Sequence, residues 1–413
     1  MEKKELEEMK KVVEEVIKNN PQILESETKK YIDKLRMEKL RLMVFESAKE
    51  FGNKVNEHLV KLYGMNPNEY SFILPIKESW FSDGNLKVEV LNTARGKCIY
   101  TLTDVGNYSI SYTMHQMTNH ASPNDLFIQL KNGIGACNGH AKEINVIMPL
   151  LYNSRQHRRN TREPLACGEA LHELEDNKKL QRIITFDAHD QGVEHSLHHT
   201  EFDNFLPSNV ILDDLLNDVD IDDLLVITTV APDNGANGRR NIYLNSLNAW
   251  CVSMEAGSFY KQRDYNKVVN GKNPIISHDY CGNNDLKGKT AIVTDDMIAS
   301  GSSMFDVMKE LKKRGINKIY IIATFALFTE GIDKFREYYK NGMFDGIYTT
   351  NLSYIPEEYK KEEWLKVCDC SEMVANIIYN THNDLSIEKL LRDKSEPQRL
   401  LQKKYDLKYG DKR

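Results

Sequence analysis

The sequence lacks any run of apolar residues long enough to cross a membrane. A membrane-spanning helix needs ~20 consecutive apolar residues, and no segment of the 413-residue chain comes close to that length. The opening stretch, residues 1–8, carries too many charges for a secretory signal peptide. We therefore expect a soluble, cytoplasmic protein that has no membrane partner.

An excess of positive charge is also missing. The chain has 55 lysine and arginine residues against 61 aspartate and glutamate residues, and its net charge is −6. The two signs are interspersed, whereas a general surface for nucleic acids requires clustered positive charge. The composition therefore argues against a nucleic-acid partner.

Paired cysteines are absent as well. The seven cysteines are scattered and none forms a Cys-x-x-Cys pair, so neither a disulfide framework nor a structural zinc site is expected. Cys368 and Cys370, near the end of a predicted strand, are interpreted as reduced core residues. Four histidines lie close together, which leaves open a histidine metal site or a polar loop rich in histidine, the interpretation that we favour. They are His189, His195, His198 and His199.

Residues 1–62 combine dense charge with apolar residues at helical spacing, and Asn19-Asn20-Pro21 interrupts the pattern. At least two helices are predicted there. The apolar positions are Met9, Val12, Val13, Val16, Ile17, Tyr31, Ile32, Leu35, Leu40 and Leu42. We interpret residues 1–65 as a helical extension that covers a domain surface or an oligomer contact.

From about residue 88 the chain alternates between short apolar runs and helical stretches. The predicted strands are Lys97–Leu102, Ile144–Leu150, Arg182–Phe186, Leu224–Val230, Thr290–Thr294 and Lys318–Ala326. The predicted helices include Glu163–Leu174, Arg239–Trp250 and Met304–Arg314. Because the strands are rich in β-branched residues without alternation, we expect them to be buried on both faces of mainly parallel sheets.

The predicted fold class is therefore α/β. Two successive sections of similar texture, residues 66–205 and 206–350, predict two similar domains. Residues 351–413 are expected to form a C-terminal segment that partly packs back on the first domain, followed by a tail that is rich in charge.

The most informative segment joins a predicted strand to a predicted helix. The strand ends in two acids, Asp295 and Asp296, and a loop of small residues, Ser300-Gly301-Ser302-Ser303, leads into the helix. Backbone N–H groups at the start of a helix bind anions, and ligands of α/β sheets lie beyond the carboxyl ends of strands. Because carboxylates accept hydrogen bonds from sugar hydroxyls, the segment predicts a site for ribose 5-phosphate. The alternative is a capped turn with incidental acids.

These residues resemble the phosphoribosyl-pyrophosphate (PRPP) motif of type I phosphoribosyltransferases and of ribose-phosphate pyrophosphokinase, also called PRPP synthetase. Further segments, in chain order, favour the second family. They are Phe81-Ser82-Asp83-Gly84 with Arg95-Gly96-Lys97, Tyr152–Arg159, Ile184–His189, Ala231–Gly235, Tyr260–Arg263, Thr349–Leu352 and Thr381–Asn383. The resemblance covers about residues 75–392. It implies two phosphoribosyltransferase-type domains in a long form of the family, with the N-terminal helices added.

The resemblance implies an enzyme that transfers pyrophosphate from MgATP to the 1-hydroxyl of ribose 5-phosphate, giving PRPP and AMP. Such transfers depend mainly on positioning and on the stabilisation of charge. Lys261 and Arg263 would be the catalytic residues, closing over the transferred group. Their i, i+2 spacing places both on one side of an extended loop. Taken alone, the segment would be interpreted as a solvated basic turn.

The same resemblance implies roles for four residues around the nucleotide phosphates. Arg155 and Gln156 would bind ATP, since arginine suits bidentate contact with phosphate. His189 and Asp233 would be the metal residues for Mg²⁺. Magnesium prefers oxygen ligands, so the role of His189 rests on the resemblance, and the alternative is a core histidine.

The adenine of ATP would be bound by Phe81, which stacks on the ring, and by Asp83, which bonds its amino group. In the family this segment comes from a neighbouring subunit. The resemblance therefore implies a homo-oligomer that is built from dimers into a hexamer. The competing interpretation of Phe81 is a core aromatic side chain.

The chain departs from the family pattern at three positions. Ala299 stands where the phosphate loop has a third acid, Asn85 where the adenine segment has Glu, and Asn160 where an Asp follows the Arg-Gln pair. Three alternatives stay open: a pyrophosphokinase for a larger ribose phosphate such as ADP-ribose, a catalytically silent regulatory subunit, and a phosphoribosyltransferase that consumes PRPP. The presence of the catalytic and metal residues argues against the silent subunit.

Overall fold

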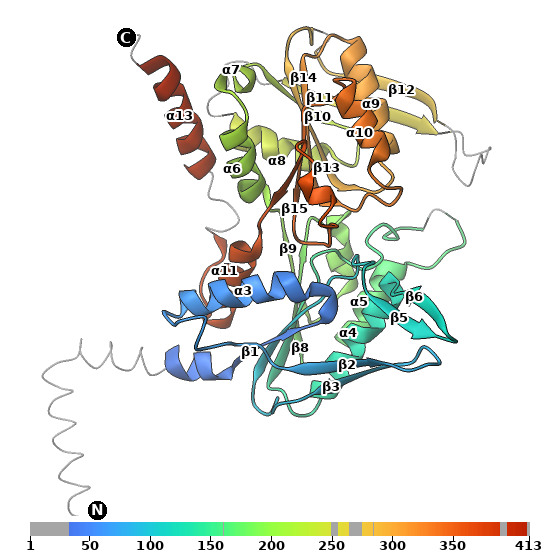
Figure 1. Ribbon diagram of the computed structural model, residues 1–413, viewed down its shortest axis with the longest axis vertical. Coiled ribbons are helices and arrows are strands. Elements are labelled where there is room, and N and C mark those ends of the chain that lie inside the picture. The colour runs from blue at the N-terminus through green and yellow to red at the C-terminus, as the bar shows by residue number, and fades with distance from the viewer. Residues whose placement is uncertain are drawn as a thin grey trace, which may run out of the picture.

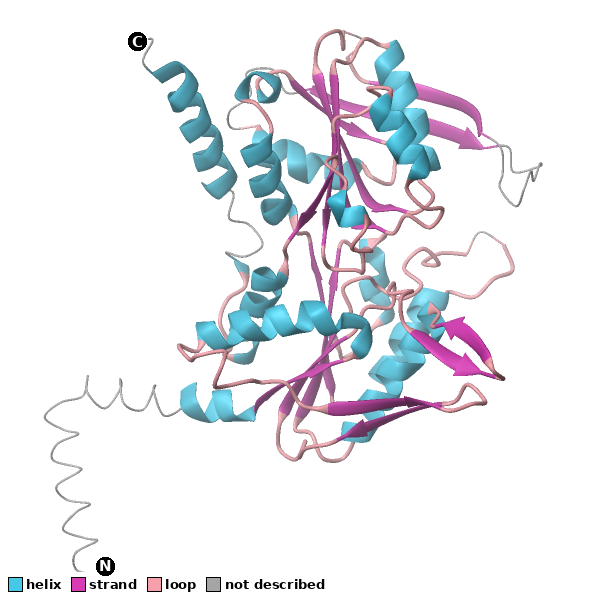
Figure 2. Cartoon of the chain, in the orientation of Figure 1, coloured by secondary structure: helices cyan, strands magenta, loops and turns pink. Residues whose placement is uncertain are grey.

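The computed structural model describes residues 33–159, 161–248, 255–263, 275–283, 285–388 and 395–410. Its core consists of two sheets that follow each other along the long axis of the molecule, each with helices on both sides (Figures 1 and 2). No helix in these residues is long and apolar enough to cross a membrane. The cytoplasmic location stays a prediction.

The first sheet has five parallel strands in the order β1-β4-β7-β8-β9. The strands are β1 (Leu40–Val44), β4 (Cys98–Leu102), β7 (Glu143–Ile147), β8 (Leu180–Phe186) and β9 (Glu201–Phe205). Every residue of β4 is buried, as expected for a parallel strand that is covered on both faces. Two hairpins lie beside this sheet: β2 (Ile76–Trp80) with β3 (Leu86–Val90), and β5 (Ser111–Met114) with β6 (Met117–His120).

The second sheet has seven strands in the order β12-β11-β10-β13-β14-β15-β16. They are β10 (Ile227–Ala231), β11 (Glu255–Arg263), β12 (Ile275–Cys281), β13 (Thr290–Ile298), β14 (Lys318–Ala326), β15 (Gly346–Thr350) and β16 (Leu365–Cys368). All neighbours are parallel except the edge pair β11 and β12. The α/β class with mainly parallel sheets is confirmed.

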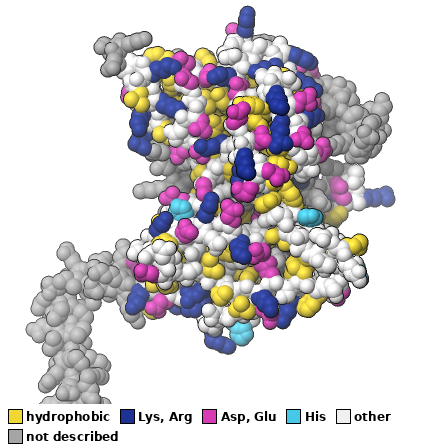
Figure 3. Space-filling model, in the orientation of Figure 1, with side chains coloured by type: hydrophobic (Ala, Val, Ile, Leu, Met, Phe, Trp, Pro, Cys, Tyr) yellow, Lys and Arg dark blue, Asp and Glu magenta, His cyan; other side chains and the backbone are white. Residues whose placement is uncertain are grey.

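Helices connect and cover the strands. They are α3 (Lys49–Leu62), α4 (Pro123–Cys137), α5 (Ala166–Glu175), α6 (Ser208–Asp218), α7 (Ile221–Leu224), α8 (Asn237–Leu247), α9 (Ser302–Lys313), α10 (Asp333–Lys340), α11 (Ser371–His382) and α13 (Ser395–Tyr409). Short 3₁₀ turns lie at Glu46–Ala48, Gln191–Ser196 and Tyr359–Lys361. Charges of both signs are interspersed over the face shown in Figure 3.

The assignment of Leu40 and Leu42 to a predicted helix is wrong, because Leu40–Val44 is a strand. Residues 33–39 are helical, but β1 follows at once and pairs in parallel with β4. Leu40, Leu42 and Met43 are completely buried within the first sheet. A five-residue segment with four apolar residues fits a buried strand as well as a buried helix, so periodicity could not separate them. Residues 1–32 lie outside the described part, and the domain boundaries stay predictions.

The predicted strand Leu224–Val230 starts too early, because Ile221–Leu224 is a short helix and β10 begins at Ile227.

The two cysteines near β16 agree with their interpretation. Cys368 and Cys370 are both buried and free. Cys251 lies outside the described residues.

The chain returns from the second sheet to the first at α11. This helix packs against α3, as Figure 1 shows, and its apolar side chains share a core with strands of the first sheet. Members of this core are Val55, Leu59, Tyr100, Leu102, Ile147, Ile184, Val374, Ile377 and Ile378. The hydroxyls of Tyr100 and Thr381 are also 3.0 Å apart. The first sheet is therefore covered on one face by residues from both ends of the chain.

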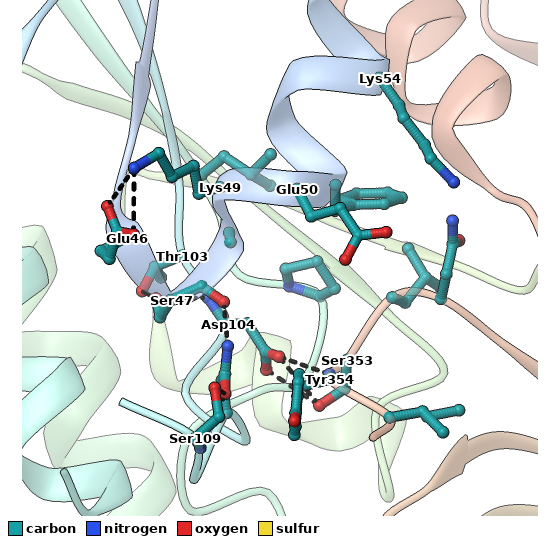
Figure 4. Close-up of a pocket in the computed structure, with 18 of the residues that line it drawn as sticks. Glu46, Ser47, Lys49, Glu50, Lys54, Thr103, Asp104, Ser109, Ser353 and Tyr354 are labelled. Atoms are coloured by element: carbon teal, nitrogen blue, oxygen red, sulfur yellow. Dashed lines mark hydrogen bonds and ion pairs between the residues drawn. The ribbon is translucent and has the colours of Figure 1, made fainter. Parts of the chain in front are cut away.

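A buried carboxylate fastens the segment after β15 to the loop after β4. Asp104 accepts hydrogen bonds from the Ser353 hydroxyl, at 3.0 Å, and from the backbone N–H of Tyr354, at 2.7 Å. Burial raises the pKa of Asp104 to about 6. These residues border a cavity of about 420 Å³, which α3 closes on another side (Figure 4). The contact joins segments that follow strands of the two different sheets.

Candidate active site at the junction of the two sheets

Residues that follow strands of both sheets meet at one place. His189 lies three residues after β8 of the first sheet, and Asp296 lies near the end of β13 in the second. The His189 Nδ1 atom is 2.7 Å from the Asp296 Oδ2 atom. Parallel sheets bind ligands beyond the carboxyl ends of their strands. The structure thus places His189, a predicted metal residue, in contact with Asp296, a predicted sugar-phosphate residue.

Asp187 holds this junction together. It follows β8 directly with a φ of 43°, in the left-handed region that non-glycine residues rarely adopt. Its carboxylate accepts bonds from Arg239 Nε, at 2.7 and 2.8 Å, and from the Thr324 hydroxyl, at 2.6 Å. Burial raises the pKa of Asp187, and the Arg239 charge opposes this shift. Residues of β8, α8 and β14 are thereby joined through one buried charge pair.

The two adjacent acids behave in opposite ways. Burial and the neighbouring Asp296 charge raise the pKa of Asp295 well above its ordinary value. Burial acts on Asp296 as well, but the hydrogen bond from His189 and the charge of Arg239 leave its pKa lowered. The bond to Asp296 in turn raises the pKa of His189. Asp296 therefore pairs with His189, whereas Asp295 has, among the described residues, only the more distant Arg239 Nη1, at 3.8 Å, as a cationic partner.

The loop after these acids has the features of a phosphate site. The acids lie inside β13, which extends to Ile298, and α9 starts at Ser302. Gly301 adopts a φ of 77° directly before the helix, and the hydroxyls of Ser300 and Ser302 are 3.2 Å apart. The first turn of α9 contains no acidic residue. Backbone N–H groups at the start of α9, with the serine hydroxyls, suit an anion.

The predicted ATP residues Arg155 and Gln156 lie in the loop after β7. The Gln156 backbone N–H donates to the Asn153 carbonyl at 2.8 Å, which shapes the loop. The ring of His157 lies 5.3 Å from that of His189, and the charge of Arg155 opposes protonation of His189. The loop is therefore next to the His189–Asp296 pair.

Asp233 belongs to the loop between β10 and α8. Its Oδ1 atom accepts the backbone N–H groups of Gly235, at 2.9 Å, and Ala236, at 3.3 Å. Its charge also contributes to the raised pKa of Asp295, so the two acids are near each other. No contact between Asp233 and His189 is present among the described residues, where His189 pairs with Asp296 instead.

A cavity of about 420 Å³ opens at this junction. Its walls combine the residues that follow β8 with the loop that leads into α8 and with residues of that helix. The lining residues are Asp187, Ala188, His189, Asp190, Gln191, Asn204, Phe205, Leu206, Gly235, Gly238, Arg239 and Ile242. The space is large enough for part of a nucleotide or a sugar phosphate, since ligand pockets begin at roughly 300 Å³.

The predicted catalytic residues lie in a strand and not in a loop. Lys261 and Arg263 are in β11, which pairs antiparallel with β12, where Lys261 is opposite His278 and Arg263 opposite Ile275. Their side chains lie outside the described part. The extended backbone that we expected is present, but ladder hydrogen bonds to β12 fix it.

Phe81 and Asp83 form the turn between β2 and β3. The Phe81 side chain is 49% exposed, so the interpretation as a core aromatic is wrong. Asp83 accepts bonds from the backbone and side-chain nitrogens of Asn85, at 3.0 and 2.8 Å. Within the described residues, neither side chain contacts the His189–Asp296 pair. The exposed turn is open to a second molecule.

The other histidines near residue 195 do not gather at the site. The Glu175 carboxylate accepts backbone N–H groups of His198, at 2.9 Å, and His199, at 2.7 Å. No grouping with metal-binding geometry includes His195, His198 or His199 among the described residues. The Glu175 carboxylate therefore binds the backbone of this segment and not the imidazole rings.

Sequence reasoning missed Asp187, Arg239 and Thr324. Asp187 stood inside the segment that pointed to His189, and its place directly after a buried strand was a usable signal. Arg239 and Thr324 gave no such signal, because Arg239 is the first residue of a predicted helix and Thr324 lies inside a predicted strand. Only the fold shows that both contact the same carboxylate.

Comparison with known proteins gives a consistent result. Residues 40–176 match the N-terminal domain of ribose phosphate pyrophosphokinase, and residues 267–392 match the phosphoribosyl synthetase-associated domain. The chain is 24% identical to the ribose-phosphate pyrophosphokinase of Gloeobacter violaceus over 360 residues, which cover 86% of this chain and 96% of the relative. It is 25% identical to that of Caldanaerobacter subterraneus over 313 residues, which cover 75% and 87%.

The fold is shared with a solved structure. The crystal structure of phosphoribosylpyrophosphate synthetase from Mycobacterium smegmatis matches with a TM-score of 0.65 at 20% sequence identity, covering 84% of this chain and 99% of that chain. Two family matches in chain order and relatives aligned along most of their length support the same assignment. The chain belongs to the ribose-phosphate pyrophosphokinase family.

Proposed function

We propose that this protein transfers pyrophosphate from MgATP to the 1-hydroxyl of ribose 5-phosphate, giving PRPP and AMP. The observation that carries the proposal is the 2.7 Å contact between His189 and Asp296. It joins the segment that resembles the family's metal motif to the segment that resembles a ribose-phosphate site. The relatives described above are named for this activity.

The acceptor sugar is assigned to the loop between β13 and α9. Its phosphate would lie at the start of α9, held by backbone N–H groups and by the hydroxyls of Ser300, Ser302 and Ser303. Gly301 keeps the entrance to the helix free of a side chain. The carboxylates of Asp295 and Asp296 would then accept hydrogen bonds from the ribose hydroxyls.

The donor nucleotide is assigned to the opposite side of the junction. Arg155 and Gln156 would bind ATP from the loop after β7, and Lys261 and Arg263 would meet the transferred group from β11. The acceptor hydroxyl attacks the β-phosphorus, and the bond from that phosphorus to the oxygen that leaves with AMP breaks. Positive side chains stabilise the negative charge that develops there.

The residues at the junction fit a magnesium ion. Magnesium prefers oxygen ligands, and the adjacent carboxylates Asp295 and Asp296 repel each other here, so that a cation beside them would be stabilised. By the family resemblance, His189 and Asp233 would hold the ion. When bound with the nucleotide, magnesium neutralises part of the charge of the phosphates.

The assembly is also part of the proposal. We assign the exposed Phe81 and Asp83 to the adenine ring of ATP in a neighbouring subunit, because no contact to the site of their own chain is present in the described residues. An exposed aromatic side chain at the tip of a hairpin is suited to such a contact. A homo-oligomer built from dimers follows from this assignment.

An AMP-forming assay with ATP, magnesium and ribose 5-phosphate tests the function. Turnover by the intact chain is expected, and a folded chain without turnover would contradict the proposal. ADP-ribose in place of ribose 5-phosphate tests the larger acceptor that Ala299 left open. PRPP with nucleobases tests the transferase alternative. None of the names of the relatives described above supports these alternatives or a silent regulatory subunit.

Substitution Lys261→Ala gives the sharper prediction. Turnover should fall at least ~100-fold, because one electrostatic contact to the transition state is lost, while ribose 5-phosphate still binds in calorimetry. Lys313→Ala, which removes an exposed lysine at the far end of α9, is the matched control and should retain turnover. Activity of Lys261→Ala within a fewfold of the wild type would exclude the assigned role.

A further inference from the structure

Three side chains with metal-binding atoms gather at the far edge of the first sheet. Cys98 and Glu143 are the first residues of β4 and β7, and they lie opposite each other in the strand register. His382 is the last residue of α11. One ligand atom from each residue lies within 4.8 Å of the other two. This edge holds the amino ends of the strands, whereas the candidate active site lies at their carboxyl ends.

The hydrogen bonding of His382 leaves one ring nitrogen without a partner. Its Nε2 atom lies 2.8 Å from the carbonyl oxygen of Arg36. A carbonyl only accepts, so Nε2 carries the proton and Nδ1 presents a bare lone pair. The residue is 9% exposed, and Nδ1 is buried with no hydrogen-bond partner among the described residues. An unpaired buried acceptor is costly unless something binds to it.

The pattern around His382 is one that metal sites use. Histidine ligands commonly donate their other N–H to a backbone carbonyl, which fixes the tautomer and the ring orientation. Cys98 is 3% exposed, and the side chain of Glu143 is 29% exposed, with Lys142 Nζ at 3.6 Å as a loose partner. Glu143 therefore lies on the side from which an ion can enter.

We propose that Cys98, Glu143 and His382 form a binding site for a zinc-type divalent ion that ties α11 to the first sheet. A thiolate, an imidazole and a carboxylate are the ligands that zinc accepts, with water in the fourth position. Binding displaces the thiol proton of Cys98 to solvent. The charges of the thiolate and the carboxylate then balance those of the ion.

The site was not visible from cysteine spacing. The absence of Cys-x-x-Cys pairs excludes sites built from close neighbours, but these three residues are far apart in the sequence. It is also separate from the magnesium residues of the proposed function. Its test therefore needs no turnover.

Cobalt(II) titration of the full chain, stripped of metal and kept in excess magnesium, tests the proposal. Magnesium occupies sites made of oxygen ligands, so cobalt reports the sulfur-containing one. We expect one equivalent of cobalt to produce a thiolate-to-metal charge-transfer band and the strong visible absorption of a tetrahedral ion. Zinc should then displace the cobalt and raise the unfolding temperature.

Matched variants identify the ligands. Cys98→Ser should abolish the charge-transfer band, and Glu143→Gln, at the most exposed ligand, should weaken cobalt binding at least ~10-fold. Cys137→Ser, a buried thiol of the same domain, and Cys281→Ser, an exposed thiol, should leave the band unchanged. Circular dichroism of each metal-free variant checks that it folds.

Two results would overturn the proposal. One is a folded wild-type chain that binds cobalt without a charge-transfer band, which would place the ion on histidine or oxygen alone. The other is a band that persists in folded Cys98→Ser or disappears in Cys281→Ser. Hydrogen exchange adds an independent measurement: zinc should slow exchange in α11 of the wild type, and a lack of any effect there would exclude the tie to the sheet.

Discussion

Gly301 shows how a single residue shapes the phosphate loop. Its φ of 77° lies in the left-handed region, which glycine adopts without the penalty that a side chain brings. A Cβ atom at this position would also come within 2.4 Å of the Phe335 ring. The backbone conformation and the packing of α10 therefore require glycine here, directly before the helix that is assigned to the sugar phosphate.

The substitution Gly301→Ala is expected to destabilise the protein by about 2 kcal/mol or more, from strain and from displacement of Phe335. Ribose 5-phosphate affinity should fall as well. Urea unfolding and calorimetry measure the two effects. Gly135→Ala, in α4 with nothing within 4 Å of the added Cβ, is the control. It should leave the affinity unchanged and should not lower the stability, because alanine favours a helix over glycine by about 1 kcal/mol. Equal behaviour of the two variants would contradict this account.

Glu78 provides a pH-dependent prediction. Its Oε1 atom accepts the backbone N–H of Glu46 at 2.9 Å, and its Oε2 atom accepts the side chain of Gln129. Burial raises the pKa of Glu78 to about 7. Between its ordinary pKa and about pH 7, Glu78 therefore keeps a proton in the folded chain that it has released in the unfolded chain. The free energy of unfolding falls as the pH rises through this range.

The free energy of unfolding should fall by about 2 kcal/mol between about pH 5 and about pH 8 because of this group. Glu78→Gln should remove that dependence and stabilise the protein at the higher pH. The new amide can also pair with Gln129 Oε1, which has no partner among the described residues. Glu89→Gln, on the neighbouring strand with a lowered pKa, is the control. An unchanged pH slope in Glu78→Gln would refute the assignment.

Single residues of the site could be predicted where their neighbours in sequence carry the signal. Asp295, Asp296 and the small residues after them are contiguous, so their chemistry was visible without a fold. The pairing of His189 with Asp296 spans 107 positions, and no local pattern encodes it. Such contacts depend on how the two sheets meet.

At the scale of elements, the Asp187–Arg239–Thr324 contact joins β8, α8 and β14. Arg239 offers a planar fork to a carboxylate that is only 7% exposed. Removal of one partner leaves the other charge buried without compensation, which is strongly destabilising. The network thereby fixes the position of the end of β8 relative to α8 and β14 of the second sheet.

The substitution Arg239→Ala should destabilise the protein by about 3 to 5 kcal/mol, measured by urea unfolding. Arg240→Ala is the matched control on the same helix. Arg240 donates to the Gly257 carbonyl at 2.8 Å and to Asn241, so its loss should cost about 1 kcal/mol. Similar losses for both variants would show that the buried carboxylate has no special role.

Elements differed in how well their sequences indicated them. The strand Lys318–Ala326 was predicted with the bounds that β14 has, because nine residues rich in β-branched and apolar types follow a helix stop at Gly315. β1 was not, because its short run follows helical residues without a break. Partner strands and helices decide such short segments, through burial that the local sequence does not contain.

At the scale of the whole molecule, the proposed oligomer has a direct test. Phe81→Ala and Lys261→Ala would each inactivate the enzyme, one through the adenine contact and the other through the transferred group. If the adenine segment comes from a neighbouring subunit, refolded mixtures contain sites with both residues intact. Activity should then return to about a quarter of wild type for random dimers.

The two variants must be shown to assemble together, for example by native mass spectrometry. Co-assembly without any return of activity would mean that Phe81 serves its own chain or no chain.

Two domains of similar texture could be predicted from the sequence. The contacts that join them could not be predicted, because Asp104 and Ser353 are 249 positions apart.

The return of α11 to the first sheet has a consequence for synthesis of the chain. The ribosome releases the strands of this sheet, from β1 to β9, long before it adds Val374, Ile377 and Ile378, which cover one face. A nascent chain therefore exposes apolar surface of its first domain until α11 has been synthesised. The last step in the folding of that domain waits for α11, and a chaperone that shields this face would act on the chain during the interval.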